Sequence, residues 1–291
     1  MYFIITSLAI LGSIALLAAV VLYVCSRRFA VKEDSRIAEV AALLPQANCG
    51  GCGFPGCAGM AAAMVKAADG GSIEGLSCPV ADRSSMDSIA SLLGMKATES
   101  KPMIATLMCR GECALRPRVV EYDGLHTCHA MHACGSGDTA CGYGCLGAGD
   151  CEASCSFGGI TINPDTRLPE VSPSLCTACG SCVKACPRNI LQIVPRGNKS
   201  RRIYVACSNR DRGAAVVKAC GVSCIGCGKC VRECKFDAIT VTDNVAHIDP
   251  DKCRLCRKCE KACPRHAIVA EGFPQPKVAE DDKDKCKDSK E

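Results

Sequence analysis

Tryptophan is absent from this sequence of 291 residues, and aromatic residues make up only 4% of it. Because aromatic side chains supply much of the buried area of an ordinary domain, this shortage argues against a single large apolar core. Dense runs of basic residues are also missing, and the formal net charge is only +5. The charge pattern therefore predicts no binding to nucleic acid.

Cysteine, in contrast, is abundant, with 28 residues in the chain. At that share, cysteine rather than apolar burial is expected to organise the fold. Length alone suggests about two domains. The cysteines occur in separate groups, however, and these groups predict several small modules in a row.

The N-terminus carries a long apolar run, residues 2–24, with no charged side chain. About 23 residues at roughly 1.5 Å each can cross a hydrocarbon core of about 30 Å. A secretory signal would carry basic residues before a shorter apolar core, whereas Arg27 and Arg28 follow this run. The positive-inside rule then predicts a single-pass protein of the cytoplasmic (inner) membrane, with the bulk of the chain on the cytoplasmic side.

This location decides how the cysteines are interpreted. Cytoplasmic thiols are kept reduced, so a disulfide scaffold is disfavoured, and metal or redox centres are favoured.

A unit of two cysteines with three residues between them, followed by a β-branched run, occurs at residues 151–162, 182–194, 230–241 and 259–270. Each unit predicts a short helix followed by a strand. Upstream cysteines complete C-x2-C-x2-C-x3-C runs that begin at Cys176, Cys224 and Cys253. This spacing is typical of 4Fe–4S clusters, because three thiolates in one loop can bind different irons while the fourth binds the partner run's cluster. Zinc sites usually combine two separate C-x2–4-C pairs, so zinc is the weaker interpretation.

The repeats predict two ferredoxin-like modules with two clusters each. In the first module, one set is Cys176, Cys179, Cys182 and Cys155, and the other is Cys141, Cys145, Cys151 and Cys186. In the second module, one set is Cys224, Cys227, Cys230 and Cys263, and the other is Cys253, Cys256, Cys259 and Cys234. The run from Cys141 departs from the pattern, because its spacing of x3 and then x5 is stretched.

Several motifs remain outside these sets. The sequence leaves open whether a further cluster or only buried, inert thiols are formed by Cys109, Cys113, Cys128, Cys134, Cys207 and Cys220. The stretch GYGCLG at 142–147 matches G-x-G-x-x-G, but it contains a cysteine and follows no expected strand. It therefore predicts no dinucleotide site.

Three features together resemble the B subunits of the Rnf complex, a membrane-bound, ion-translocating ferredoxin:NAD oxidoreductase. They are the N-terminal anchor, the motif LLPQANCGGCGFPGC at 43–57, and CGYGCLGAGDC at 141–151 leading into the ferredoxin modules. The resemblance implies that a 4Fe–4S cluster is bound by Cys49, Cys52, Cys57 and Cys78. With the four clusters of the ferredoxin modules, the expected number is five.

The resemblance also implies a function. Reduced ferredoxin would donate electrons to this chain, an electron carrier within the translocase, and partner subunits would include flavoproteins and an NAD-binding subunit. The coupling ion, Na⁺ or H⁺, stays open. Two alternatives also stay open: a membrane-tethered polyferredoxin that serves a hydrogenase, or a reducer of a redox-sensing regulator.

The expected fold class is α+β, with an N-terminal transmembrane helix, a small four-cysteine iron–sulfur domain and two tandem ferredoxin-like 2x(4Fe–4S) modules. The expected segments are a transmembrane anchor at 1–26, the four-cysteine 4Fe–4S domain at 27–90, a connector of unknown fold at 91–135, the first module at 136–196, a connecting segment at 197–219, the second module at 220–270 and a disordered charged tail at 271–291.

Basic residues accompany the cysteine runs, in Arg196, Lys199, Arg201 and Arg202 and again around the last run. Soluble ferredoxins are usually acidic, so Arg254, Arg257 and Lys258 are candidates for docking the donor. The plainer interpretation is that these are ordinary solvated side chains.

Overall fold

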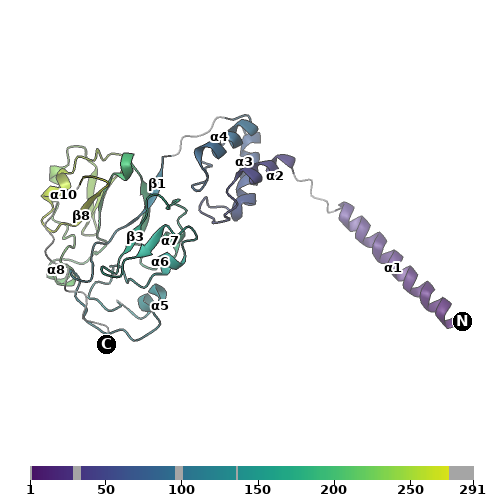
Figure 1. Ribbon diagram of the computed structural model, residues 1–291, viewed down its shortest axis with the longest axis horizontal. Coiled ribbons are helices and arrows are strands. Elements are labelled where there is room, and N and C mark those ends of the chain that lie inside the picture. Colours follow the sequence, from purple (N-terminus) through teal and green to yellow (C-terminus); the bar gives the residue numbers. More distant parts are fainter. Residues whose placement is uncertain (1, 29–33, 96–100, 136, 275–291) are drawn as a thin grey trace.

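The computed structural model describes residues 2–28, 34–95, 101–135 and 137–274. They form an apolar helix, a small helical region and a larger body of short helices and strands (Figure 1). We refer to residues 34–95 as the opening region, to 101–196 as the middle region and to 201–274 as the C-terminal region. The charged tail predicted for 271–291 lies, from residue 275 onward, outside the described residues.

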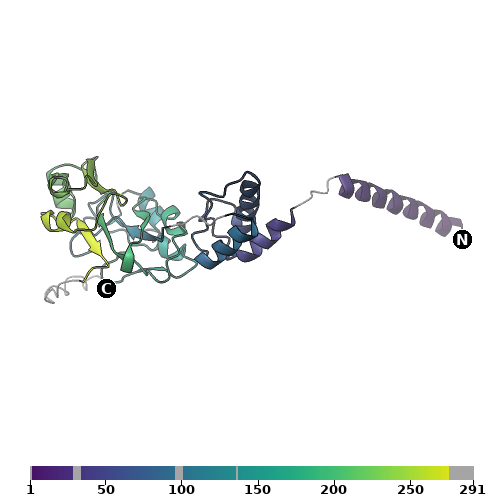
Figure 2. The ribbon, with the colours of Figure 1, turned by 90° about the horizontal axis from the view of Figure 1, so that it is seen from above.

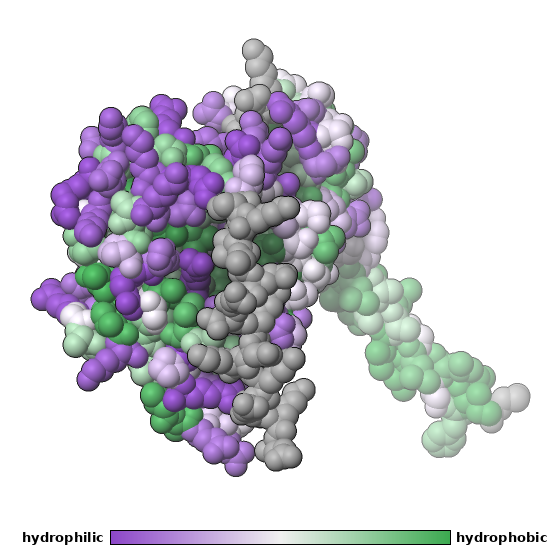
Figure 3. Space-filling view, turned by 60° about the vertical axis from the view of Figure 1, so that its left-hand side comes forward, coloured by the Kyte–Doolittle hydropathy of each residue, from purple (hydrophilic) through white to green (hydrophobic). Residues whose placement is uncertain are grey.

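The N-terminal apolar run forms helix α1 (Tyr2–Arg28), which is long and apolar enough to cross a membrane. None of its residues is buried against the rest of the chain. Figure 3 shows α1 as an almost uninterrupted apolar surface, whereas the visible face of the body carries many hydrophilic side chains. An apolar surface of this kind is expected of a helix whose side chains contact the hydrocarbon core of a membrane.

Three helices build the opening region, which lies between α1 and the body in both ribbon views (Figures 1 and 2). They are α2 (Ser35–Leu43), α3 (Gly56–Asp69) and α4 (Arg83–Leu92). Asp34 caps α2, because its side chain accepts a hydrogen bond from Arg36 N–H at 2.9 Å, and Asp82 caps α4 in the same way.

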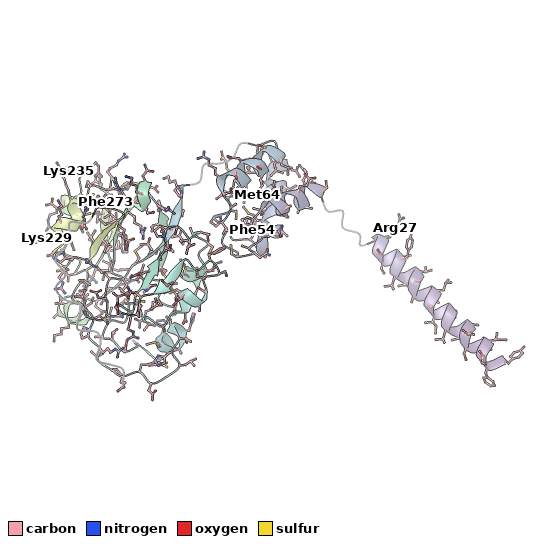
Figure 4. The ribbon with its side chains drawn as sticks, in the orientation of Figure 1. Arg27, Phe54, Met64, Lys229, Lys235 and Phe273 are labelled. Atoms are coloured by element: carbon pink, nitrogen blue, oxygen red, sulfur yellow. The ribbon has the colours of Figure 1, made fainter. Side chains whose placement is uncertain are left out.

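The core of the opening region is aliphatic and methionine-rich. Val40, Met60, Met64 and Ile89 are almost fully buried in it. Methionine adapts to irregular gaps, so it can fill a core that lacks large aromatic side chains. Figure 4 shows Met64 in this region together with Phe54 of the cysteine loop.

The body consists of short elements joined by cysteine-bearing loops. The middle region contains β1 (Met103–Leu107), α5 (Cys128–Ala133), α6 (Asp150–Ala153), β2 (Ile160–Ile162), β3 (Pro169–Val171), α7 (Ser181–Lys184) and β4 (Leu191–Pro195). The 3₁₀ turn η1 (Asn198–Ser200) follows it. The C-terminal region contains β5 (Arg202–Val205), α8 (Ala214–Ala219), α9 (Lys229–Glu233), β6 (Ile239–Thr242), β7 (Val245–Ile248), α10 (Lys258–Ala262) and β8 (Ile268–Glu271).

The middle and C-terminal regions share one strand plan. In each, the first strand pairs with the last, β1 with β4 and β5 with β8, and an inner antiparallel pair lies between them in sequence, β2 with β3 and β6 with β7. Asp243 and Asn244 form the tight turn of the β6–β7 hairpin, both with positive φ, as a two-residue turn of this kind requires. This mixed helix and strand content agrees with the expected ferredoxin-like α+β class.

The outer strand pairs extend beyond the expected segment boundaries. Strand β1 comes from the segment expected as a connector, and Ile104 and Ala105 within it are buried. Strand β5 likewise comes from the expected connecting segment. Strands β1 and β5 form because the apolar strands β4 and β8 need antiparallel partners for their backbone hydrogen bonds.

Candidate metal centres

The four short helices of the cysteine repeat, α6, α7, α9 and α10, each begin after a residue in the left-handed conformation. These residues are Gly149 before α6, Gly180 before α7, Gly228 before α9 and Arg257 before α10. Glycine adopts positive φ without steric cost, and here it turns the chain between a loop cysteine and the buried cysteine of the helix. The repeat found in the sequence is therefore also a repeat of backbone conformation.

In the C-terminal region, two small cavities are each lined by four cysteines. One is lined by Cys224, Cys227, Cys230 and Cys263, and the other by Cys234, Cys253, Cys256 and Cys259. Each set takes three cysteines from one run and the fourth from the other run. The geometry thus brings together the groups that the spacing predicts.

In the middle region, Cys182 has Cys155, Cys176 and Cys179 as its thiol neighbours, which is also the predicted set. Backbone N–H groups point at two of these sulfurs. Gly159 N lies 3.3 Å from Cys155 Sγ, and Ala105 N of strand β1 lies 3.5 Å from Cys176 Sγ. Such hydrogen bonds to sulfur are one way in which a protein sets the potential of a cluster.

The other set of the middle region differs from the expected one. Its cavity is lined by Cys128, Cys145, Cys151 and Cys186, and Cys141 is not among the lining residues. The sequence explains the exchange when Cys145 is taken as the first position of a regular run. Ala148 then occupies the second position, Cys151 the third and Cys155 the fourth. Cys128, from helix α5, takes the place in space that a cysteine at 148 would have.

Asp150 holds α5 against this set. Its carboxylate accepts hydrogen bonds from Cys128 N–H at 2.9 Å and from His129 N–H at 3.2 Å, and it lies 2.8 Å from His129 Nδ1. Partial burial raises the pKa of Asp150, but the bonds from His129 and Cys128 outweigh this and keep the pKa below its ordinary value. Cys151 directly follows Asp150 in the sequence, so these hydrogen bonds, which we call the Asp150 clamp, hold Cys128 beside Cys151.

Cys141 lies elsewhere, with its sulfur 3.5 Å from Asn209 Nδ2. Cys113 lies beside Asp165, and Cys134 is exposed at the end of α5. In the part of the chain that the structure describes, neither Cys113 nor Cys134 lines the four-cysteine cavities.

The opening motif surrounds the start of α3. Cys57 lies in the first turn of this helix, and its N–H donates to Asn48 Oδ1 at 2.8 Å. Burial raises the pKa of the Cys78 thiol, and the neighbouring Cys52 and Cys49 thiolates raise it further. Cys78, which follows α3 in the sequence, therefore lies close to Cys49 and Cys52 of the loop before this helix.

Burial dominates the chemistry of the thiols in these sets. It raises the pKa of Cys151 and of Cys145 to about 12, and that of Cys182 to about 11. Bound thiols are thiolates, so metal binding at these positions would release protons. The residues fit a cluster better than a single ion, because no three His, Cys, Asp or Glu side chains of the described ranges converge on one ion. Around a cube of irons, each thiolate instead binds its own iron.

The opening region touches the middle region at a cysteine loop. A Cβ atom added to Gly51 would lie 2.5 Å from the carbonyl oxygen of Cys179, so only glycine allows this approach. Lys184 Nζ lies 3.4 Å from the carbonyl oxygen of Gly50 beside it. The loop between Cys49 and Cys52 therefore packs directly on the loop between Cys176 and Cys182.

The candidate docking residues have different surroundings. Arg254 and Lys258 are exposed. Arg257 is half-buried, donates from Nε to Glu260 at 2.7 Å and lies over the ring of Phe273. The side chain of Arg257 is thus engaged within the chain, which leaves Arg254 and Lys258 as the free positive charges of this set.

Three protein-family models match the chain. A 4Fe-4S dicluster domain matches residues 223–287, a 4Fe-4S binding domain matches 169–192, and a model described as "Putative Fe-S cluster" matches 44–69. Together with the fold and the cysteine sets, these matches define an iron–sulfur electron-transfer protein with ferredoxin-like 4Fe–4S domains.

Curated relatives narrow this class. The B subunit of the Na(+)-translocating ferredoxin:NAD(+) oxidoreductase complex of Acetobacterium woodii is 42% identical over 265 residues, which cover 91% of this chain and 77% of the relative. The B subunit of the ion-translocating oxidoreductase complex of Methanosarcina acetivorans is 39% identical, covering 91% of this chain and 97% of the relative. The proton-translocating counterpart from Clostridium ljungdahlii is 37% identical, covering 90% and 91%. The chain belongs to the family of B subunits of Rnf-type ion-translocating oxidoreductase complexes.

Proposed function

We propose that this chain carries electrons from reduced ferredoxin to the partner subunits of an ion-translocating ferredoxin:NAD oxidoreductase. Helix α1 would hold it to the cytoplasmic membrane as a single-pass protein, with the body on the cytoplasmic side. A 4Fe–4S cluster, when bound, accepts and releases one electron. The chain's own part is to hold the clusters in line, shield them from water and adjust their potentials.

The contact between Gly51 and Cys179 is the observation that carries this proposal. Electron tunnelling falls off steeply with distance, so a relay needs neighbouring centres whose loops touch. The opening cysteine set and the set containing Cys179 meet backbone to backbone. Clusters that did not exchange electrons with each other would not need such a close contact between their loops.

The cysteine surroundings support a relay as well. Cys151, Cys182, Cys230 and Cys259 are buried, so these ligand positions exclude water, whereas Cys227 and Cys256 are exposed and offer points of entry or exit. Residues 142–147 form part of the cysteine-bearing loop before α6 and not a strand–turn–helix unit. We assign flavin and NAD chemistry to partner subunits because the relatives are single subunits of an oxidoreductase complex.

The experiment is to replace Gly51 by alanine in the full-length chain within its purified complex. The added Cβ would push the two loops apart, so ferredoxin-dependent NAD reduction should fall at least tenfold while the iron content stays unchanged. Gly70→Ala is the matched control, because a Cβ there meets only two carbonyl oxygens of the preceding helix, at 3.3 and 3.9 Å.

Two results would contradict the proposal. An unchanged rate in Gly51→Ala would mean that electrons do not pass between the opening and middle regions. Failure of reduced ferredoxin to reduce the chain, together with copurification of a hydrogenase in place of flavoprotein subunits, would favour the polyferredoxin alternative.

A further inference from the structure

We propose that Cys109, Cys141, Cys207 and Cys220 form a further 4Fe–4S site, at the junction of the middle and C-terminal regions. This site extends the proposed relay, and its existence is tested below without any measurement of electron transfer.

Cys109 and Cys207 lie opposite each other on two chain segments that are hydrogen-bonded to one another. Arg110 N–H donates to Ala206 C=O at 3.0 Å, and Ser208 Oγ donates to Met108 C=O at 2.9 Å. Cys109 and Cys207 are the central residues of these two segments. Each follows the first strand of its region, β1 or β5, so the shared strand plan brings them together.

Cys141 and Cys220 approach the same place from two other loops. Asn209, two residues after Cys207, donates from Nδ2 to Cys141 Sγ at 3.5 Å. A Cβ atom added to Gly111, two residues after Cys109, would lie 3.2 Å from Cys220 Sγ. Four segments that are distant in sequence thus present one thiol each.

The thiols also act on one another electrostatically. Burial raises the pKa of Cys220, and the neighbouring Cys109 and Cys141 raise it further. Burial raises the pKa of Cys207 to about 12, with Cys224 and Cys109 as its thiol neighbours. Cys109 is thus a neighbour of both Cys207 and Cys220, which agrees with the pairing of residues 108–110 with 206–208 and with the approach of Cys220 to Gly111.

One buried arginine, Arg116, and one half-buried arginine, Arg188, provide the second, independent observation. Arg116 is only 5% exposed, and its guanidinium lies against Gly144 and donates to the carbonyl oxygen of Cys145. Arg188 donates from Nη1 to the carbonyl oxygen of Cys141 at 3.1 Å. The Nε atoms of both arginines have no hydrogen-bond partner, and within the described residues neither guanidinium pairs with a carboxylate.

A buried guanidinium without an anion is costly. Four neutral thiols would not offset it, whereas four thiolates on a cluster carry the negative charge that these arginines lack. Arg188 interacts electrostatically with Cys141, Cys145 and Cys109, and Arg116 interacts with Cys145 and Cys220, so the two arginines face the proposed site and the neighbouring Cys145. The positive charge is therefore built into the wall of the proposed site.

The position of the site gives it a role. Cys145 N–H, from a ligand position of the middle region, points at Cys109 Sγ at 3.4 Å. Backbone N–H groups of Cys224 and Asn209 are directed at the sulfur of Cys207. Cys224 is a ligand position of the C-terminal region, so the proposed site touches one cysteine set on each side and links the two regions.

The test is an anaerobic count of iron, acid-labile sulfide and zinc on the purified full-length chain, with EPR of the reduced protein. Six cubanes give about 24 irons per chain, and five give about 20. Cys220→Ala and Cys141→Ala should each lose about four irons and the same EPR signal. Cys134→Ala is the matched control, because this cysteine is exposed and outside the site.

A count near 20 that is unchanged in Cys220→Ala would overturn the inference, as would stoichiometric zinc lost in that variant. Loss of different EPR signals in Cys141→Ala and Cys220→Ala would also overturn it, because the two residues would then serve different centres. If ferredoxin reduces a chain with about 20 irons, the relay stands and only the further site fails.

Discussion

The middle and C-terminal regions are built on one plan but complete it differently. The C-terminal region takes all the cysteines of its two sets from two regular runs, between Cys224 and Cys263. The middle region has Ala148 in one run and fills that place with Cys128, which lies outside the repeat. A helix outside the repeat thus brings a cysteine to the cavity in place of the one that the run lacks.

The hydrogen bonds of Asp150 show how helix α5 is held so that Cys128 can take the place of a cysteine at position 148. In a regular run, the left-handed residue before the helix is enough to aim the second cysteine. Helix α5 has only six residues and would not hold its position by itself, so Asp150 binds its first N–H groups. The C-terminal region, with its ligands close in sequence, has no need of such a clamp.

The largest effect is expected from breaking a regular run. Cys227→Ala should remove one cluster of the C-terminal region and unfold much of residues 201–274, because buried cysteines form part of its core. Metal binding in small metallo-domains contributes on the order of 10 kcal/mol to folding. Limited proteolysis and EPR of the full-length chain would show this loss.

The opening region is the internal control for that variant. It has its own core around Met60 and Met64, so its EPR signal should persist in Cys227→Ala. Simultaneous loss of every cluster would mean that the regions do not fold as separate units.

A smaller effect is expected from Cys128→Ala. This variant should lose about four irons from the middle region, while the paired strands β1 and β4 keep the region folded. Adding Ala148→Cys to it should restore the iron, because the second change completes a regular run. Iron analysis and circular dichroism of both variants would measure the loss and the rescue.

Ala148→Cys alone is the matched control for the rescue, and its iron content should equal that of the unchanged chain. Unaltered iron in Cys128→Ala would show that Cys141, as the spacing predicts, or another residue completes this set.

The smallest effect is expected at the surface of the C-terminal region, which is basic around α9 and α10. Figure 4 shows Lys229 and Lys235 at the end of the body farthest from Arg27, so a soluble donor could reach them without meeting the membrane. Reversing Arg254 and Lys258 to Glu should slow reduction by an acidic ferredoxin several-fold at low salt, and less at high salt. Stopped-flow absorbance across a salt series would measure it.

Lys66→Glu with Lys218→Glu is the control, because it changes the net charge equally at exposed positions on α3 and α8. Arg257 is left unchanged, since reversing it would break its ion pair with Glu260 and confuse docking with stability. Equal rates for the two double variants at all salt concentrations would place the entry point elsewhere.

The features that depend on residues close together along the chain could be predicted from the sequence. An uncharged run of sufficient length becomes α1. A regular C-x2-C-x2-C-x3-C run brings its first three thiols together because a residue in the left-handed conformation, glycine or Arg257, turns the chain between them. The exchange of fourth cysteines between runs followed from the same repeat, and the structure brings Cys155, Cys234 and Cys263 to the expected sets. The family also followed from the sequence, since the anchor and the opening motif are both local.

The contacts between segments that are far apart along the chain could be seen only in the folded protein. Spacing placed Cys141 with Cys145, but the fold places Cys128 there and moves Cys141 to Asn209. Ala148 was the available signal, because taking Cys145 as the start of the run reveals the missing second cysteine. Cys109 and Cys207 offered no such signal. They meet because the segment after β1 is hydrogen-bonded to the segment after β5, through Arg110 N–H and Ala206 C=O. Local spacing in the sequence does not record such a pairing.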